Sequence, residues 1–79
     1  MVVMADPANP ITRLREAAGM TRRAFARHLG VAYTTLMNAE LGYPLHIPPT
    51  LLMALTRAGY DTENLQGEYI AWHSSPQKA

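Results

Sequence analysis

The stretch that decides the fold is TRRAFARHLGVAYTTLMNAELG, residues 21–42. Its first half predicts a short helix, since Thr21 is a good N-cap and Gly30 a good C-cap. The apolar residues between these caps recur at the spacing of one buried helical face: Phe25, Ala26 and Leu29. A second helix is expected from residue 32 or 33 to a cap at Gly42, with Leu36 turned inward. The stretch therefore predicts two short helices joined by a tight turn.

Further helices are predicted on both sides of this pair. The helix before it spans residues 10–18, with Asn9 as its N-cap and a proline in its first turn. After the pair, three prolines in the segment YPLHIPP, residues 43–49, make the connection extended and stiff. Leu45 and Ile47 are expected to attach this connection to the core.

Two helices complete the predicted fold. The fourth begins near Pro49, and its inward-facing residues are Leu51, Leu52, Leu55 and Ala58. The fifth begins after a cap at Asp61 or Thr62. Its apolar stripe consists of Leu65, Tyr69 and Trp72 or His73. No segment alternates as a strand does, so we expect an all-α, compact five-helix domain over residues 9–73. A flexible segment, 1–8, precedes it and a polar tail, 74–79, follows.

The composition narrows the function classes. A chain of 79 residues without cysteine holds one small domain and has neither a disulfide framework nor a thiolate zinc site. No apolar run approaches the roughly 20 residues that cross a bilayer, so we expect no membrane association and a cytoplasmic location. The three histidines lie on different predicted elements without a carboxylate at ligand spacing. Because no catalytic set or Gly-rich phosphate loop is present either, we expect a non-enzyme without metal or cofactor.

The charges are unevenly distributed along the chain. Five arginines fall within a short region in which Glu16 is the only nearby acid: Arg13, Arg15, Arg22, Arg23 and Arg27. Beyond residue 58 acidic residues outnumber basic ones, because Asp61, Glu63 and Glu68 are balanced only by Lys78. Such a distribution suits a polyanion bound to one face, or simply a solvated charged surface. Charge alone does not distinguish the two.

Several motifs between residues 10 and 60 occur at the spacing of a known family. They are Leu14-Arg15, Thr21 with Ala26, Leu29-Gly30-Val31, Glu40 with Gly42, and Pro49-Thr50-Leu51-Leu52. In these motifs the chain resembles the phage-repressor-like (Cro/XRE-type) helix-turn-helix DNA-binding family. The resemblance implies a lambda-repressor-like fold whose third helix enters the major groove of double-stranded DNA.

The resemblance also implies which residues would touch DNA. The base contacts would be Ala32, Tyr33, Thr34, Met37 and Asn38. The phosphate contacts would be Thr21, Arg22, Arg23, Arg27, Tyr43 and His46. Asn38 can pair with adenine, and no arginine lies on the third helix to read guanine, so A·T-containing steps are favoured. Tyr43 and His46 stand where the family usually has basic residues, which predicts a shallow dependence of affinity on salt.

Two further residues are expected to act on the scaffold. In the family, an arginine at the position of Arg15 commonly pairs with the glutamate that ends the third helix, here Glu40. That pair would fix the reading helix to the rest of the domain. Ala32 replaces the Ser or Thr that usually caps this helix, and the loss should cost about 1 kcal/mol of helix stability.

These patterns predict a sequence-specific transcriptional regulator, a repressor or Cro-like protein. It would bind a palindromic operator as a homodimer and would be nucleoid-associated when bound. The alternative is a protein-interaction module, antitoxin-like or adaptor, that uses the same fold to bind a protein partner. The last helix leaves a second question open. Its apolar residues either complete the monomer core or form a dimer face: Leu65, Tyr69, Ile70 and Trp72.

Overall fold

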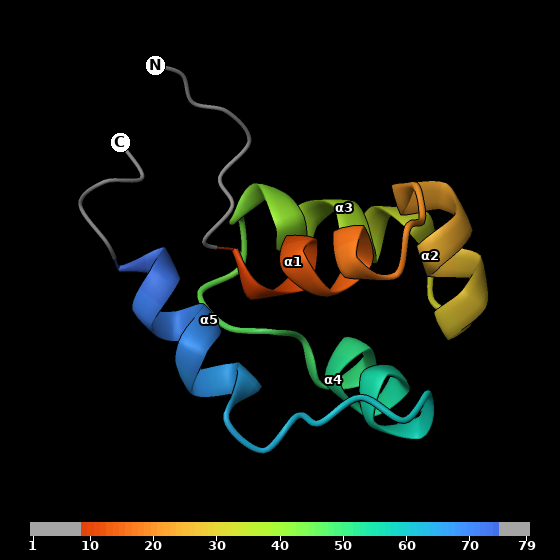
Figure 1. Ribbon diagram of the computed structural model, residues 1–79. Helices are drawn as coiled ribbons and strands as arrows, with labels where there is room; N and C mark the ends of the chain where they lie inside the picture. The colour runs from red at the N-terminus through yellow and green to blue at the C-terminus, as the bar shows by residue number, and fades with distance from the viewer. Residues whose placement is uncertain (1–8, 75–79) are drawn as a thin grey trace.

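The computed structural model describes residues 9–74 and shows five α-helices, with no strand in that range (Figure 1). The helices are α1 (Pro10–Ala17), α2 (Arg22–Leu29), α3 (Tyr33–Leu41), α4 (Pro49–Arg57) and α5 (Leu65–His73). The predicted all-α, five-helix fold is confirmed. The predicted N-terminal segment, 1–8, and all of the predicted tail except Ser74 lie outside the described residues.

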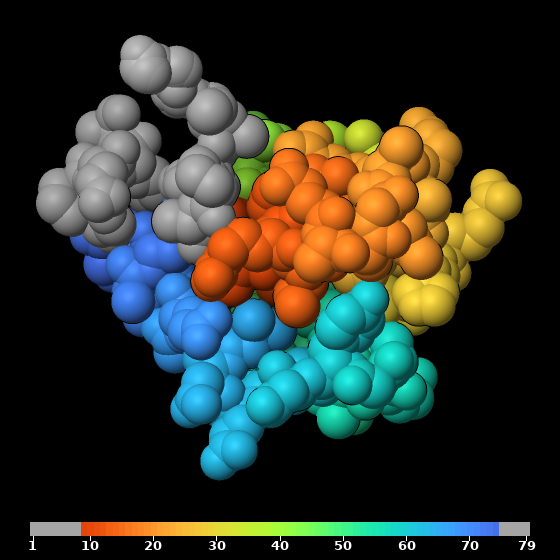
Figure 2. Space-filling model, viewed as in Figure 1, coloured from red at the N-terminus to blue at the C-terminus, as the bar shows by residue number. Residues whose placement is uncertain are grey.

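The helices pack in a simple arrangement. α1 and α3 lie side by side, α2 crosses one end of α3, and α4 and α5 lie below them in Figure 1. Figure 2 shows that α1 covers α3 from this side, so that only a few green atoms of α3 are visible behind it. Within residues 9–74 no helix is long and apolar enough to cross a membrane.

The ends of the central helices follow their local sequence signals. The Thr21 hydroxyl accepts a hydrogen bond from the backbone N–H of Ala24 at 3.1 Å, which caps α2. Gly30 and Gly42 end α2 and α3 in the left-handed conformation, with φ of 77° and 84°. The Ala32 side chain gives α3 no such cap. The predicted boundaries of the helix pair are therefore confirmed.

One hydrophobic core joins all five helices. Its fully enclosed side chains include Phe25 from α2, Leu36 from α3 and Tyr69 from α5. The buried apolar residues are Ile11, Phe25, Ala26, Leu29, Leu36, Ala39, Ile47, Leu51, Ala54, Leu55, Leu65, Tyr69 and Trp72. The helix pair is thus supported from beneath by α4 and α5.

The connection between α3 and α4 corrects one prediction. Ile47 is buried as expected, but Leu45 is 71% exposed and does not attach the connection to the core. The Gln66 side chain forms two hydrogen bonds with the backbone of Ile47, at 2.7 and 3.1 Å. These bonds hold the backbone of Ile47 against α5, so the connection needs no second apolar anchor.

The boundaries of α4 and α5 correct two more predictions made from the sequence. Ala58 is exposed because α4 ends one residue before it, and Ala54 fills the inward position instead. α5 begins at Leu65, later than a cap at residue 61 or 62 would place it. The Asp61 carboxylate accepts a hydrogen bond from the backbone N–H of Glu63 at 3.1 Å, so it stabilises a turn rather than the helix start.

The stripe on α5 completes the monomer core. Leu65, Tyr69 and Trp72 are buried within the chain itself, which rules them out as an exposed dimer face. Only Ile70 of the proposed dimer residues is exposed, at 45%. Of the two alternatives that the sequence leaves open, the three buried residues therefore take the monomer core, because this small domain uses them to enclose its own interior.

Candidate nucleic-acid interface

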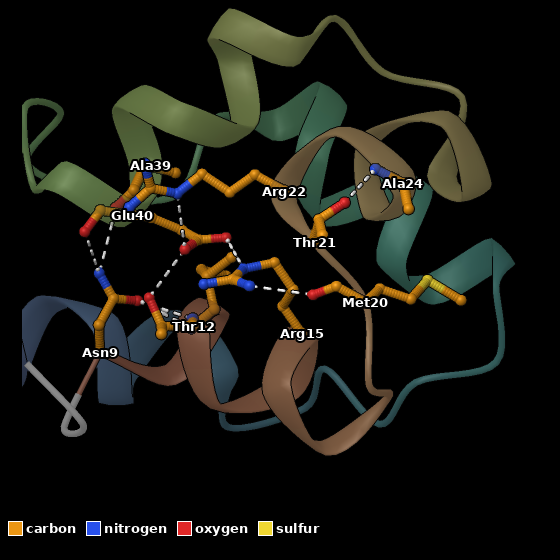
Figure 3. A network of polar contacts seen from close by, with 10 residues as sticks. Asn9, Thr12, Arg15, Met20, Thr21, Arg22, Ala24, Ala39 and Glu40 are labelled. Carbon is orange, nitrogen blue, oxygen red and sulfur yellow. Dashed lines mark hydrogen bonds and ion pairs between the residues drawn. The ribbon is translucent and has the colours of Figure 1, made fainter. Parts of the chain in front are cut away.

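The carboxylate of Glu40 is the centre of a polar cluster that orients α3 (Figure 3). Its side chain has no exposed surface. One oxygen accepts hydrogen bonds from the Thr12 hydroxyl and from Nε of Arg22, both at 3.1 Å. The other accepts from Nε of Arg15 at 2.8 Å. The predicted pair of Arg15 and Glu40 is confirmed, and the buried charge has three donors from α1 and α2.

Arg22, a predicted phosphate contact, has a partner within the fold that its sequence position does not predict. Its Nε donates to Glu40 at 3.1 Å, and its side chain is 34% exposed. A sequence signal for this second pair exists. Between residues 17 and 60 the only acid is Glu40, so neighbouring arginines have a single carboxylate to share.

Asn9 connects the start of α1 to the end of α3. Its side-chain oxygen accepts hydrogen bonds from the backbone N–H groups of Ile11 and Thr12, as expected of an N-cap. Its Nδ2 donates to the carbonyls of Ala39 and Glu40, at 3.3 and 2.9 Å. The second role was missed by the sequence patterns, because it depends on two segments that meet only in the folded chain.

The outward face of α3 carries the predicted base-contact residues. Ala32 and Thr34 are exposed, whereas Tyr33, Met37 and Asn38 are half-buried. Within residues 9–74 the side chains of Thr34 and Asn38 form no hydrogen bond. Their polar groups remain available to an external partner.

The outer face of α2 gathers the remaining cationic residues. Arg23, Arg27 and His28 line a shallow surface hollow of about 410 Å³ together with Thr21. Three of these four are predicted phosphate contacts, so the structure brings Thr21, Arg23 and Arg27 together, and it adds His28. The guanidinium carbon of Arg23 also lies 4.7 Å from the centre of the Tyr33 ring, which links this face to the start of α3.

The two predicted contacts in the α3–α4 connection are placed differently from each other. Tyr43 is 70% exposed and lines a second hollow of about 380 Å³ with Asn38 and Thr35 of α3. His46 is exposed but lines neither hollow. Tyr43 therefore extends the outward face of α3, whereas His46 is not joined to it.

The surface charge of this region has one sign. Glu40 is the only acid between residues 17 and 60, and its carboxylate is buried against two arginines. The exposed charged side chains of α2 and α3 are therefore the cations Arg23 and Arg27. The acids beyond residue 60 lie on the segment before α5 and on α5 itself, below the helix pair in Figure 1. Such a face attracts anions.

By fold and site geometry the chain is a five-helix, all-α domain with a crossed pair of helices, α2 and α3, that presents a cationic face. No protein-family model matches the chain, and neither the curated proteins nor the solved structures gave a match. Within residues 9–74 no group of three His, Asp or Glu side chains is placed to hold a metal ion.

Proposed function

We propose that this chain is a non-enzymatic, sequence-specific DNA-binding regulator of the phage-repressor-like type, a repressor or Cro-like protein. In this proposal α3 enters the major groove of double-stranded DNA, and α2 lies across the phosphate backbone with Arg27 beside a phosphate. Two copies bind a palindromic operator, with their reading helices about 34 Å apart, one helical turn of DNA.

The observation that carries the proposal is the burial of the only carboxylate in the helix pair. A surface that meets DNA must approach one negative charge for every ~1.7 Å of the duplex axis. Glu40 would repel that charge if it were exposed, but it is enclosed and held between Arg15 and Arg22. The exposed groups on the same helices are cationic or neutral, which suits a polyanion.

The polar face of α3 supports sequence reading within that general attraction. Thr34 is exposed in the first turn of α3, and Asn38 lies one turn further along the same helix. An asparagine side chain can form two hydrogen bonds with adenine, and a threonine methyl can contact the thymine methyl. The anchored C-terminal end of α3 would keep these side chains in a fixed register on the bases.

Gel-shift titration against genomic fragments, at two salt concentrations, tests the proposal. We expect one or a few fragments to bind at least about a thousandfold more tightly than bulk DNA. The affinity should fall as the salt concentration rises, because cation–phosphate contacts release counterions. Binding that never exceeds the non-specific level would disprove the sequence-specific function.

A charge placed on α3 gives a sharper test of the surface. Thr34→Asp puts a carboxylate in the first turn of α3, where a helix tolerates a negative charge, so the fold should persist. Facing phosphates, the same charge should weaken DNA binding at least ~10-fold. Gly67→Asp is the matched control, since it adds the same charge to the first turns of α5, where a Cβ meets open space. Equal losses in both variants would argue against α3 as the binding face.

Substitution of Arg22 is unsuitable as a test of the DNA-binding surface, although its sequence position suggests a phosphate contact. Replacing it with alanine would remove one of the two arginines that compensate the buried Glu40. A loss of DNA binding in that variant would then report the stability of the fold as much as a phosphate contact.

A second function is favoured by one observation, the exposed apolar side chains near the end of α3. Leu41, Tyr43 and Leu45 are 46%, 70% and 71% exposed, and Ile70 of α5 is 45% exposed. Exposed apolar side chains of this size suit the alternative, a protein-interaction module of antitoxin-like or adaptor type. Co-purification of a stoichiometric protein partner that is lost in Leu45→Ser but kept in Thr34→Asp would support it over DNA binding.

A further inference from the structure

The contact between Arg23 and Tyr33 joins the two helices of the pair at the outer surface. Arg23 is exposed on α2, Tyr33 is the first residue of α3, and the guanidinium carbon lies 4.7 Å from the ring centre. A guanidinium that lies over an aromatic face keeps the N–H groups at its edge free for other partners. Within residues 9–74 Arg23 takes part in no ion pair. The Tyr33 ring therefore holds the Arg23 guanidinium, a cationic fork of N–H groups, at the start of α3.

This fork changes what the face of α3 can recognise. α3 itself contains no lysine or arginine, so its own side chains suit adenine and thymine better than guanine. Guanine presents two acceptors, O6 and N7, side by side in the major groove. Two N–H groups of one guanidinium match that pair of acceptors, and α2 supplies such a group through Arg23.

Resting on the DNA-binding function proposed above, we propose that Arg23 reads a guanine in each half-site and that Tyr33 is the positioning residue that holds it there. Arg23 then determines specificity from outside the reading helix. The operator half-site should combine one G·C pair beside the start of α3 with the A·T-containing steps that Thr34 and Asn38 favour.

Arg27 shows why a phosphate contact is the weaker assignment for Arg23. Both arginines are exposed on α2 and line the same hollow. Among residues 9–74 no aromatic ring lies under the Arg27 guanidinium, whereas Arg23 has the ring of Tyr33. A phosphate needs only a nearby cation, so it requires no ring to orient the side chain. The ring under Arg23 directs it toward α3, the helix proposed to face the bases.

Selection of bound sequences from a random DNA pool tests the inference with the full chain. We expect the wild type to select a half-site with a G·C pair, and Arg23→Ala to lose about 10-fold or more of the preference at that pair alone. Arg27→Ala is the matched control. It should select the wild-type half-site, bind it more weakly, and lower the salt slope by about 1.

Variants of Tyr33 test its positioning role. Tyr33→Phe keeps the ring and should retain the guanine preference, whatever it does to overall affinity. Tyr33→Ala removes the ring and should weaken the preference at the same base pair that Arg23→Ala affects. Arg23→Lys keeps the charge without the planar fork, so it should also lose the preference while retaining most of the affinity.

Two outcomes overturn the inference and are distinguishable. If Arg23→Ala selects the wild-type half-site and only binds it more weakly, Arg23 contacts phosphate and the inference is wrong, while the proposed function stands. If the wild type itself selects no sequence, the proposed function fails and the inference fails with it. Circular dichroism and thermal unfolding of each variant show that a changed selection does not come from an unfolded chain.

Discussion

The two ends of α3 are held in very different ways. The C-terminal end receives side-chain hydrogen bonds from α1, α2 and α5, which converge on Ala39, Glu40 and Gly42. At the N-terminal end, Ala32 supplies no side-chain cap, and the guanidinium of Arg23 lies over the Tyr33 ring. One end fixes the position of the helix, and the other leaves its side chains free. A reading helix needs both properties, and here they are separated along its axis.

The largest effect should come from breaking the anchored end at Glu40. Glu40→Ala removes the carboxylate that accepts from the Thr12 hydroxyl and from the Nε of both Arg15 and Arg22, which should lower the free energy of unfolding by about 3 kcal/mol. Urea unfolding followed by circular dichroism measures the loss. Since a small domain has little stability to lose, Glu40→Gln provides a milder variant that keeps the shape and one acceptor oxygen. Wild-type stability in both variants would show that the cluster does not anchor α3.

The next effect concerns the contact between the end of α3 and α5. A Cβ at Gly42 would lie 2.9 Å from the Trp72 ring, and the left-handed φ of 84° disfavours any side chain. We expect Gly42→Ala to lower the free energy of unfolding by about 2 kcal/mol or more. Gly30→Ala is the matched control, because it has a similar φ of 77° and open space around the Cβ. Its cost should be about 1 kcal/mol, and the difference measures the overlap with Trp72.

Whether a contact at either end of α3 can be predicted from the sequence depends on how far apart its residues lie along the chain. The caps at Thr21, Gly30 and Gly42 depend on neighbours within about one helical turn, and each was predicted correctly. The contacts of Asn9 and Arg22 with the end of α3 depend on how helices cross, which local spacing does not encode. The pairing of Arg15 with Glu40 was predicted only through the family resemblance.

The same limit explains the errors in the apolar residues. Leu45 lies in a proline-rich segment without a helical period, so no pattern shows which of its apolar residues faces inward. Gln66, which fixes Ile47 instead, is remote in sequence. On α5 the periodic pattern identified the buried stripe, but periodicity does not distinguish a monomer core from a dimer face. The structure decides that question for Leu65, Tyr69 and Trp72.

Alkaline pH should weaken the anchored C-terminal end of α3 by a smaller amount, through Tyr69. The Tyr69 hydroxyl donates to the Ala39 carbonyl at 2.8 Å, and burial raises the pKa of Tyr69 from 10.0 to about 12. The folded state therefore holds this proton more tightly than the unfolded chain does. Its contribution to stability is complete below about pH 10 and is lost as the pH rises toward 12. The free energy of unfolding should therefore fall less steeply above about pH 10 in Tyr69→Phe than in the wild type. Identical pH profiles of unfolding would contradict this role of the Tyr69 hydroxyl.

The smallest effect should come from strengthening the free end. Ala32 is exposed and has the extended backbone of an N-cap, with φ of −64° and ψ of 141°, but no side-chain acceptor. Ala32→Ser should therefore raise the free energy of unfolding by about 0.5–1 kcal/mol, whereas Thr21→Ala should lower it by a similar amount at the start of α2. Because Ala32 and Glu40 share no bonding partner, the effects of Ala32→Ser and Glu40→Gln should add within about 0.5 kcal/mol. A larger coupling in the double variant would show that the two ends of α3 are not held independently.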